Sequence, residues 1–190
     1  MWGWAELVGG LALWWLAHGA RRLAPRLRED LGRVLGEGPT RGLISLLLLA
    51  ALVLMVHGFR RAPTLALWQP PEPLYWLADA VLLAALFVFG IGLAKGRLMA
   101  RLRHPMLSGT ALWAAGHLLV AGHAAAVVLF AGLGLWALVQ MRLINADEGP
   151  WEPPLPGDAL NDGKLALAAL FAWSLIAGIH WLFGLAVFGP

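Results

Sequence analysis

The hydrophobic pattern of this chain is a series of long apolar stretches separated by shorter polar segments. Six stretches are nearly free of charge: 2–20, 42–59, 75–94, 106–120, 123–141 and 165–188. Most approach the roughly 20 apolar residues that a helix needs to cross a bilayer. The fourth and fifth are separated only by Ala121 and Gly122, and together they are too long for one span, which predicts a helical hairpin. We therefore expect an all-α polytopic membrane bundle of about six transmembrane helices.

The composition agrees with a membrane protein. The chain is 60% hydrophobic and only 13% charged, whereas soluble domains carry roughly 25% charged residues. A length of 190 residues suits one domain, so we expect a single membrane domain over 1–190. The basic residues cluster between the apolar stretches, as in membrane loops. This pattern predicts the lipid bilayer, and not a nucleic acid, as the partner.

The placement of the cations predicts an orientation. Arg60 and Arg61 lie in the second connection, and the other twelve of the 14 cations fall in the first, third and fifth: Arg21, Arg22, Arg26, Arg28, Arg33, Arg41, Lys95, Arg97, Arg101, Arg103, Arg142 and Lys164. Connections rich in Lys and Arg stay in the cytoplasm. We therefore expect both termini on the non-cytoplasmic side. No basic residue precedes the first apolar stretch, so a cleavable signal peptide is not expected.

The candidate chemistry lies in six histidines within or at the edges of these stretches: His18, His57, His104, His117, His123 and His180. An ionisable side chain within a membrane span indicates a functional site, and imidazole is a common ligand of haem iron. The absence of cysteine excludes covalent haem attachment, iron–sulfur clusters and thiolate nucleophiles. We expect a cofactor held between helices by histidines.

The positions of three histidines leave the ligand pair open. His18 and His104 lie near the predicted cytoplasmic ends of their helices, whereas His117 lies about 18 Å along its helix, near mid-membrane. Depth alone favours His18 with His104. A hydrogen-bonded structural histidine, or a helix cap in the case of His104, is the alternative. Trp14 and Trp113 each lie one turn before a histidine and are placed to wall a pocket.

Several segments resemble a known family. They are His18-Gly-Ala, Leu35-Gly36-Glu37, Arg41-Gly-Leu-Ile-Ser, the run 103–117 (Arg-His-Pro-Met-Leu-Ser-Gly-Thr-Ala-Leu-Trp-Ala-Ala-Gly-His) and 136–144 (Trp-Ala-Leu-Val-Gln-Met-Arg-Leu-Ile). This set resembles the NnrU family, small bacterial membrane proteins associated with nitrite and nitric oxide metabolism. The resemblance covers most of 1–148 and is most specific over 103–145. It implies the bacterial inner membrane.

The resemblance also implies a cofactor and a role. The same family includes the plant and cyanobacterial 15-cis-zeta-carotene isomerases, which are haem b proteins with the same Arg-His-Pro…Gly-His block. The resemblance therefore implies haem b, with His18 and His117 at the axial-ligand positions. From their positions along the chain, we also expect His104, Trp14 and Trp113 to contact the cofactor. The expected role lies in nitric oxide metabolism, as a sensor, a protector or an assembly factor for nitric oxide reductase.

Two other functions remain open. If the chain is an enzyme, a haem-dependent cis-trans isomerase of a polyene such as a carotenoid is the leading expectation. Arg-His-Pro-x-x-x-Gly is also similar to the S-adenosylmethionine site of membrane methyltransferases, in which a helical hairpin and an acidic pair follow. Here Asp147-Glu148 follows the predicted hairpin, but Leu107 stands where a Tyr is usual.

Overall fold

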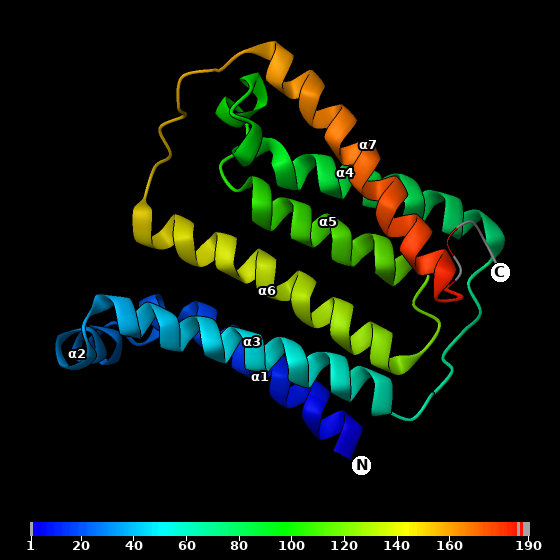
Figure 1. Cartoon of the computed structure of the whole chain (residues 1–190), viewed down its shortest axis with the longest axis horizontal. Coiled ribbons are helices and arrows are strands. Elements are labelled where there is room, and N and C mark those ends of the chain that lie inside the picture. The colour runs from blue at the N-terminus through cyan, green and yellow to red at the C-terminus, as the bar shows by residue number, and fades with distance from the viewer. Residues whose placement is uncertain (1, 186, 188–190) are drawn as a thin grey trace. The chain divides into compact units, whose positions relative to one another are not determined.

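The computed structural model describes residues 2–185 and 187, and within them the chain is helical with no strand (Figure 1). The elements are α1 (Trp2–Leu23), α2 (Pro25–Leu35), α3 (Glu37–Arg61), α4 (Glu72–Ala94), the 3₁₀ turn η1 (Arg97–Ala100), α5 (Pro105–Leu119), α6 (Ala124–Glu148) and α7 (Ala159–Leu182). The all-α prediction is confirmed for these residues. Each of the six predicted stretches overlaps one of the helices α1, α3, α4, α5, α6 and α7.

Four helices are long and apolar enough to cross a membrane, namely α3, α4, α6 and α7. Only 11% to 28% of the residues in their apolar windows are buried inside the protein, so most of their apolar surface is left for lipid to cover. α5 has 15 residues, which is short for a span. The membrane character of the chain therefore rests on these four helices.

Helix α2 was not expected from the hydrophobic pattern. The hydrophobic pattern predicts a basic connection there, because five charged residues lie among its 11 positions. Pro25 opens the helix, where its fixed φ and missing N–H cost nothing. Leu27, Leu31 and Val34 follow at helical spacing, so the apolar stripe was present but too short to outweigh the charges.

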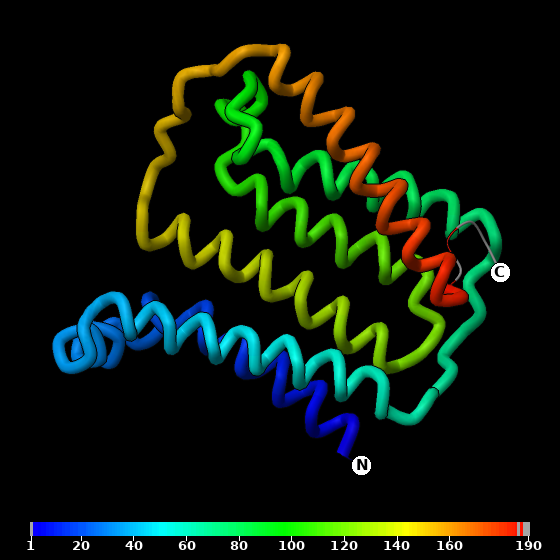
Figure 2. The backbone as a smooth tube through the Cα atoms, viewed as in Figure 1, coloured from blue at the N-terminus to red at the C-terminus, as the bar shows by residue number. Residues whose placement is uncertain are grey.

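The predicted helical hairpin over 106–141 is confirmed. α5 ends at Leu119 and α6 begins at Ala124, and the chain turns between them (Figure 2). The turn is held by the segment before α4: Trp68 Nε1 donates to the carbonyl of Ala121 at 3.0 Å, and the Leu67 amide donates to the carbonyl of Gly122 at 2.9 Å. The hairpin is therefore fixed by tertiary hydrogen bonds as well as by its sequence.

The chain divides into two compact units, 1–66 with 123–132 and 67–122 with 133–190. In the first unit, α1 and α3 lie side by side (Figure 1), in close contact where α1 has glycine. A Cβ on Gly10 would lie 2.8 Å from the backbone nitrogen of Met55. Small residues allow such close helix contact in membranes.

In the second unit, α4 packs against both α5 and α7. A glycine again marks the α4–α5 contact, because a Cβ on Gly109 would lie 2.6 Å from the Cα of Phe89. This arrangement brings residues of α4, α5 and α7 around one cavity, described below.

Candidate functional site

Two histidines share one local arrangement, each with a tryptophan one helical turn before it. In α1 the His18 ring lies 4.3 Å from the Trp14 ring, centroid to centroid, and His18 Nδ1 lies 3.1 Å from the Trp14 carbonyl. In α5 the His117 ring lies 4.8 Å from the Trp113 ring, and Nδ1 lies 2.9 Å from the Trp113 carbonyl. The i, i+4 spacing of the helix produces both pairs.

This hydrogen bond fixes the tautomer of both imidazoles. A carbonyl oxygen only accepts, so Nδ1 carries the hydrogen and donates. In the neutral ring the lone pair then lies on Nε2, one of the two ring atoms with which histidine binds a metal. Metal-bound histidines almost always donate their other ring N–H in this way. His18 and His117 therefore share the same tautomer, with the hydrogen on Nδ1.

His117 lines a cavity of about 240 Å³ within the second unit. Its polar lining comes from three helices, with Tyr75 and Asp79 on α4, His117 on α5 and His180 on α7. Tryptophan and aliphatic side chains complete the wall, including Trp113. The cavity thus combines an apolar wall with a small polar group, as ligand sites commonly do.

Two polar residues of this cavity are notable beside His117. Asp79 Oδ2 is buried and has no hydrogen-bond partner among the described residues. His180 Nδ1 lies 2.9 Å from the Ile176 carbonyl, so by the same argument its lone pair lies on Nε2. A carboxylate and two imidazoles therefore face one space between apolar helices.

His104 has a different environment, at the start of α5. Its Nε2 lies 2.8 Å from Asn145 Oδ1, which gives the ring a partner at the end of α6. The neighbouring Arg103 donates from Nη1 to the Gly149 carbonyl at 2.7 Å, and its Nη2 lies 3.6 Å from a Glu148 carboxylate oxygen. These contacts join the start of α5 to the end of α6, which indicates a structural role.

A family model described as NnrU protein matches residues 6–187 of the chain. The chain belongs to the NnrU family. No match was found among curated proteins or among solved structures. The resemblance seen in the motifs is therefore confirmed at the level of the family, and a single family model extends over both compact units.

The NnrU-like block 103–117 covers α5 except for its last two residues, and it also includes the two residues before the helix. At one end Arg103 and His104 contact the end of α6, and at the other Trp113 and His117 line the cavity. The same motif thus supplies the contact between α5 and α6 and, in His117, a candidate haem ligand. The pairing of His18 with His117 involves both compact units and stays a prediction.

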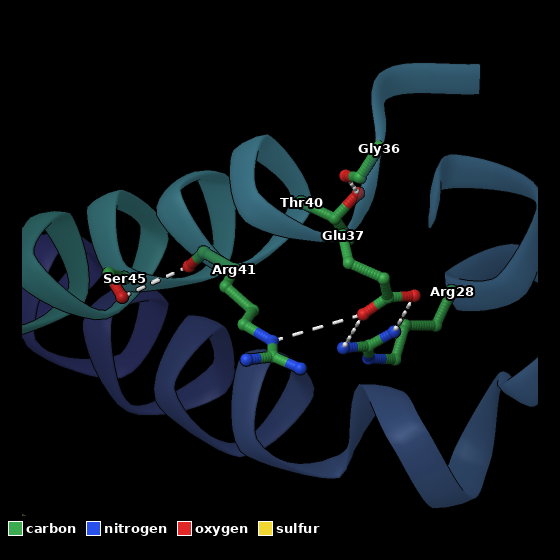
Figure 3. A network of polar contacts seen from close by, with 6 residues as sticks. All are labelled: Arg28, Gly36, Glu37, Thr40, Arg41 and Ser45. Carbon is green, nitrogen blue, oxygen red and sulfur yellow. Dashed lines mark hydrogen bonds and ion pairs between the residues drawn. The ribbon is translucent and has the colours of Figure 1, made fainter. Parts of the chain in front are cut away.

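Another NnrU-like segment, Leu35-Gly36-Glu37 with Arg41, forms the corner between α2 and α3 (Figure 3). Gly36 has φ +88°, a conformation that favours glycine. Arg28 donates to both carboxylate oxygens of Glu37, at 3.4 and 3.3 Å, and Arg41 Nε lies 3.9 Å from Glu37 Oε2. This part of the motif has a structural explanation.

Among the described residues, no three or more histidine and acidic side chains are arranged to hold a metal ion. A haem iron takes only axial ligands from the protein, so this finding does not test the predicted haem.

The remaining histidines lie outside the cavity: His57 is exposed on α3, and the His123 ring packs 5.5 Å from Phe59.

The hydrophobic pattern assigns no specific role to His180 and does not predict Asp79 as a member of the site, although both line the cavity. Asp79 lies near the start of the apolar stretch 75–94. Its proximity to the His117 cavity depends on the packing of α4, α5 and α7. The one available signal was that Asp79 is the only acid within its apolar stretch.

Proposed function

We propose that this NnrU family member is an integral membrane protein that binds haem b, with His117 as an axial ligand. The observation that carries the proposal is the His117 ring itself, half-buried beside a cavity with its Nδ1–H donated to the Trp113 carbonyl. Nε2 is then the basic atom, as haem iron requires. The absence of cysteine makes the attachment noncovalent.

His18 is the second proposed ligand. The family resemblance implies it, and the Trp14–His18 pair repeats the ring contact and the hydrogen bond of the Trp113–His117 pair. Replacing His18 with Ala should change the visible spectrum of the bound haem. A spectrum identical to that of the wild type would exclude His18 as a ligand.

We further propose a role in nitric oxide metabolism, as a sensor, a protector or an assembly partner of nitric oxide reductase. Ferrous haem supplies an iron that binds nitric oxide. The cavity beside His117 is small and mostly apolar, which suits a small uncharged ligand better than a large polar substrate.

Two measurements test this role. Nitric oxide is added to the reduced protein while the Soret band is followed, and a poly-cis carotenoid is supplied to cells that express the chain. A nitrosyl shift of the band supports the nitric oxide role. An isomerised carotenoid without such a shift would instead assign the chain to the polyene isomerases.

The proposed topology has six membrane spans in the bacterial inner membrane, with both termini on the non-cytoplasmic side. The four helices α3, α4, α6 and α7 support it by length and composition, and the distribution of the 14 cations supports the orientation. Reporter fusions after Arg33 and after Thr64 should report opposite compartments, with Arg33 cytoplasmic. The same compartment for both would contradict the topology.

A membrane methyltransferase is the second candidate, supported by one contact. Arg103 of the Arg-His-Pro motif and Glu148 of the acidic pair lie 3.6 Å apart, as a shared cofactor site would require. However, Arg103 also donates to the Gly149 carbonyl, and His104 contacts Asn145. Both side chains are therefore already bound within the protein. Binding of S-adenosylmethionine by the purified protein would favour this candidate over haem.

A further inference from the structure

A groove in the second unit, distinct from the histidine cavity, follows the end of α4. Its volume is about 610 Å³, within the range of ligand sites. Arg97 and Arg101 line one side, and the proline-rich segment 153–156 lines the other. The function proposed above does not involve this groove.

Hydrogen bonds donated by backbone amides hold the two sides together. The Gly157 amide donates to the Gly96 carbonyl at 3.1 Å, and the Arg97 amide donates to Asp162 Oδ2 at 2.8 Å. Asp162 lies in the first turn of α7, so α7 is tied to the 3₁₀ turn as well. Because prolines also restrict the backbone of 153–156, the groove is a built feature and not a chance gap between loops.

The charges in the groove are unbalanced. Arg97 and Arg101 are its only ionisable lining residues, and neither guanidinium forms an ion pair or a hydrogen bond within the described part of the chain. The next arginine along the chain, Arg103, is paired with Glu148. Asp162 accepts from a backbone amide of the groove. The groove therefore presents two positive charges without a carboxylate in its lining.

The position of the groove indicates where its ligand comes from. Arg97 lies three residues after the end of α4 at Ala94, a helix able to cross a membrane. This places Arg97 close to the polar boundary of the bilayer, at the level of lipid headgroups. Leu155, also in the lining, is 90% exposed, so an apolar side chain stands beside the two cations.

We propose that this groove binds the phosphodiester headgroup of an anionic membrane phospholipid. Guanidinium groups bind phosphate oxygens through two parallel hydrogen bonds. Leu155 and the neighbouring prolines then contact the glycerol and the first acyl carbons. Basic pockets beside membrane helices bind anionic lipids by this chemistry.

Native mass spectrometry of the full-length protein in detergent micelles tests the proposal. Dioleoyl phosphatidylglycerol is the probe, and dioleoyl phosphatidylcholine is the neutral lipid with the same acyl chains. For the double variant R97Q/R101Q we expect phosphatidylglycerol binding about 30-fold weaker, equivalent to about 2 kcal/mol, and unchanged phosphatidylcholine binding. The control is R33Q, which removes an exposed arginine that pairs with Asp30 at 3.2 Å in α2; it should bind like the wild type.

Equal phosphatidylglycerol binding by the wild type and the double variant would overturn the proposal. Inorganic phosphate is added in a separate arm, and binding of phosphate with no preference between the two lipids would also overturn it, in favour of a free-anion site.

Should the double variant fail to fold, Ala100→Glu keeps both arginines and adds a carboxylate to the groove lining. Weaker phosphatidylglycerol binding by this variant supports the lipid site, and unchanged binding contradicts it.

Discussion

The two ends of α5 carry the most distinctive residues of the NnrU motif, and they differ in what surrounds them. At the Pro105 end, Arg103 and His104 have short contacts to the end of α6. At the Leu119 end, His117 lines a cavity with Asp79 and His180. The two histidines of this motif therefore use different ring nitrogens. His104 contacts Asn145 through Nε2, and His117 donates to the Trp113 carbonyl through Nδ1.

Two histidines of the same motif therefore need not have the same role. The nitrogen that each ring uses decides which atom remains basic. His104 Nε2 lies against an amide oxygen, whereas His117 donates through Nδ1 to the Trp113 carbonyl and lines a cavity. We therefore expect substitutions at the His104 end of α5 to lower the stability of the fold, and substitution of His117 at the other end to reduce cofactor binding.

The largest expected effect comes from a change that undocks α5 from α4. Gly109→Val places a Cβ where the backbone of Phe89 lies 2.6 Å away, and overpacking of this kind typically costs about 1–3 kcal/mol or more. We expect a strong decrease in the thermal midpoint, together with loss of both ends of the site. Gly178→Val is the control, since nothing lies within 4 Å of its Cβ position. Equal midpoints for the two variants would contradict the α4–α5 contact.

A smaller effect is expected at Arg103. Arg103→Gln removes the charged donor to the Gly149 carbonyl and the pairing with Glu148, and a hydrogen bond to a charged group contributes about 1.5–3 kcal/mol. Glu148→Gln is the matched comparison, because it removes the ion pair and keeps the Gly149 contact of Arg103. The Glu148 side chain is 54% exposed, and exposed pairs contribute about 1 kcal/mol or less. Chemical denaturation should show the larger loss for Arg103→Gln. The reverse order would show that the Gly149 contact is unimportant.

The smallest of these stability effects is expected at His104. His104→Ala removes the 2.8 Å contact with Asn145, a loss of about 1 kcal/mol. Asn145→Ala should cost a similar amount, and the double variant should cost less than the sum of the two. Strict additivity in this double-mutant cycle would show that the two side chains do not interact in solution.

The parts of the fold that the sequence predicted are those governed by local patterns. The long apolar stretches, the α5–α6 hairpin and the Trp-x-x-x-His spacing follow from periodicity and composition alone. Helix α2 was missed because its apolar stripe is short and heavily interrupted by charge. The contact between His104 and Asn145 spans 41 residues, and the meeting of Asp79, His117 and His180 depends on how three helices pack. Neither follows from a local pattern.

The central claim is that His117, and not His104, is an axial ligand of haem b. The most direct test is the haem-to-protein ratio and the visible spectrum of the wild type, His117→Ala and His104→Ala, all expressed with added haem and purified in the same detergent. The account predicts a Soret band for the wild type and for His104→Ala, and a lost or clearly shifted band for His117→Ala. A wild type without haem, or a His117→Ala spectrum identical to that of the wild type, would contradict it.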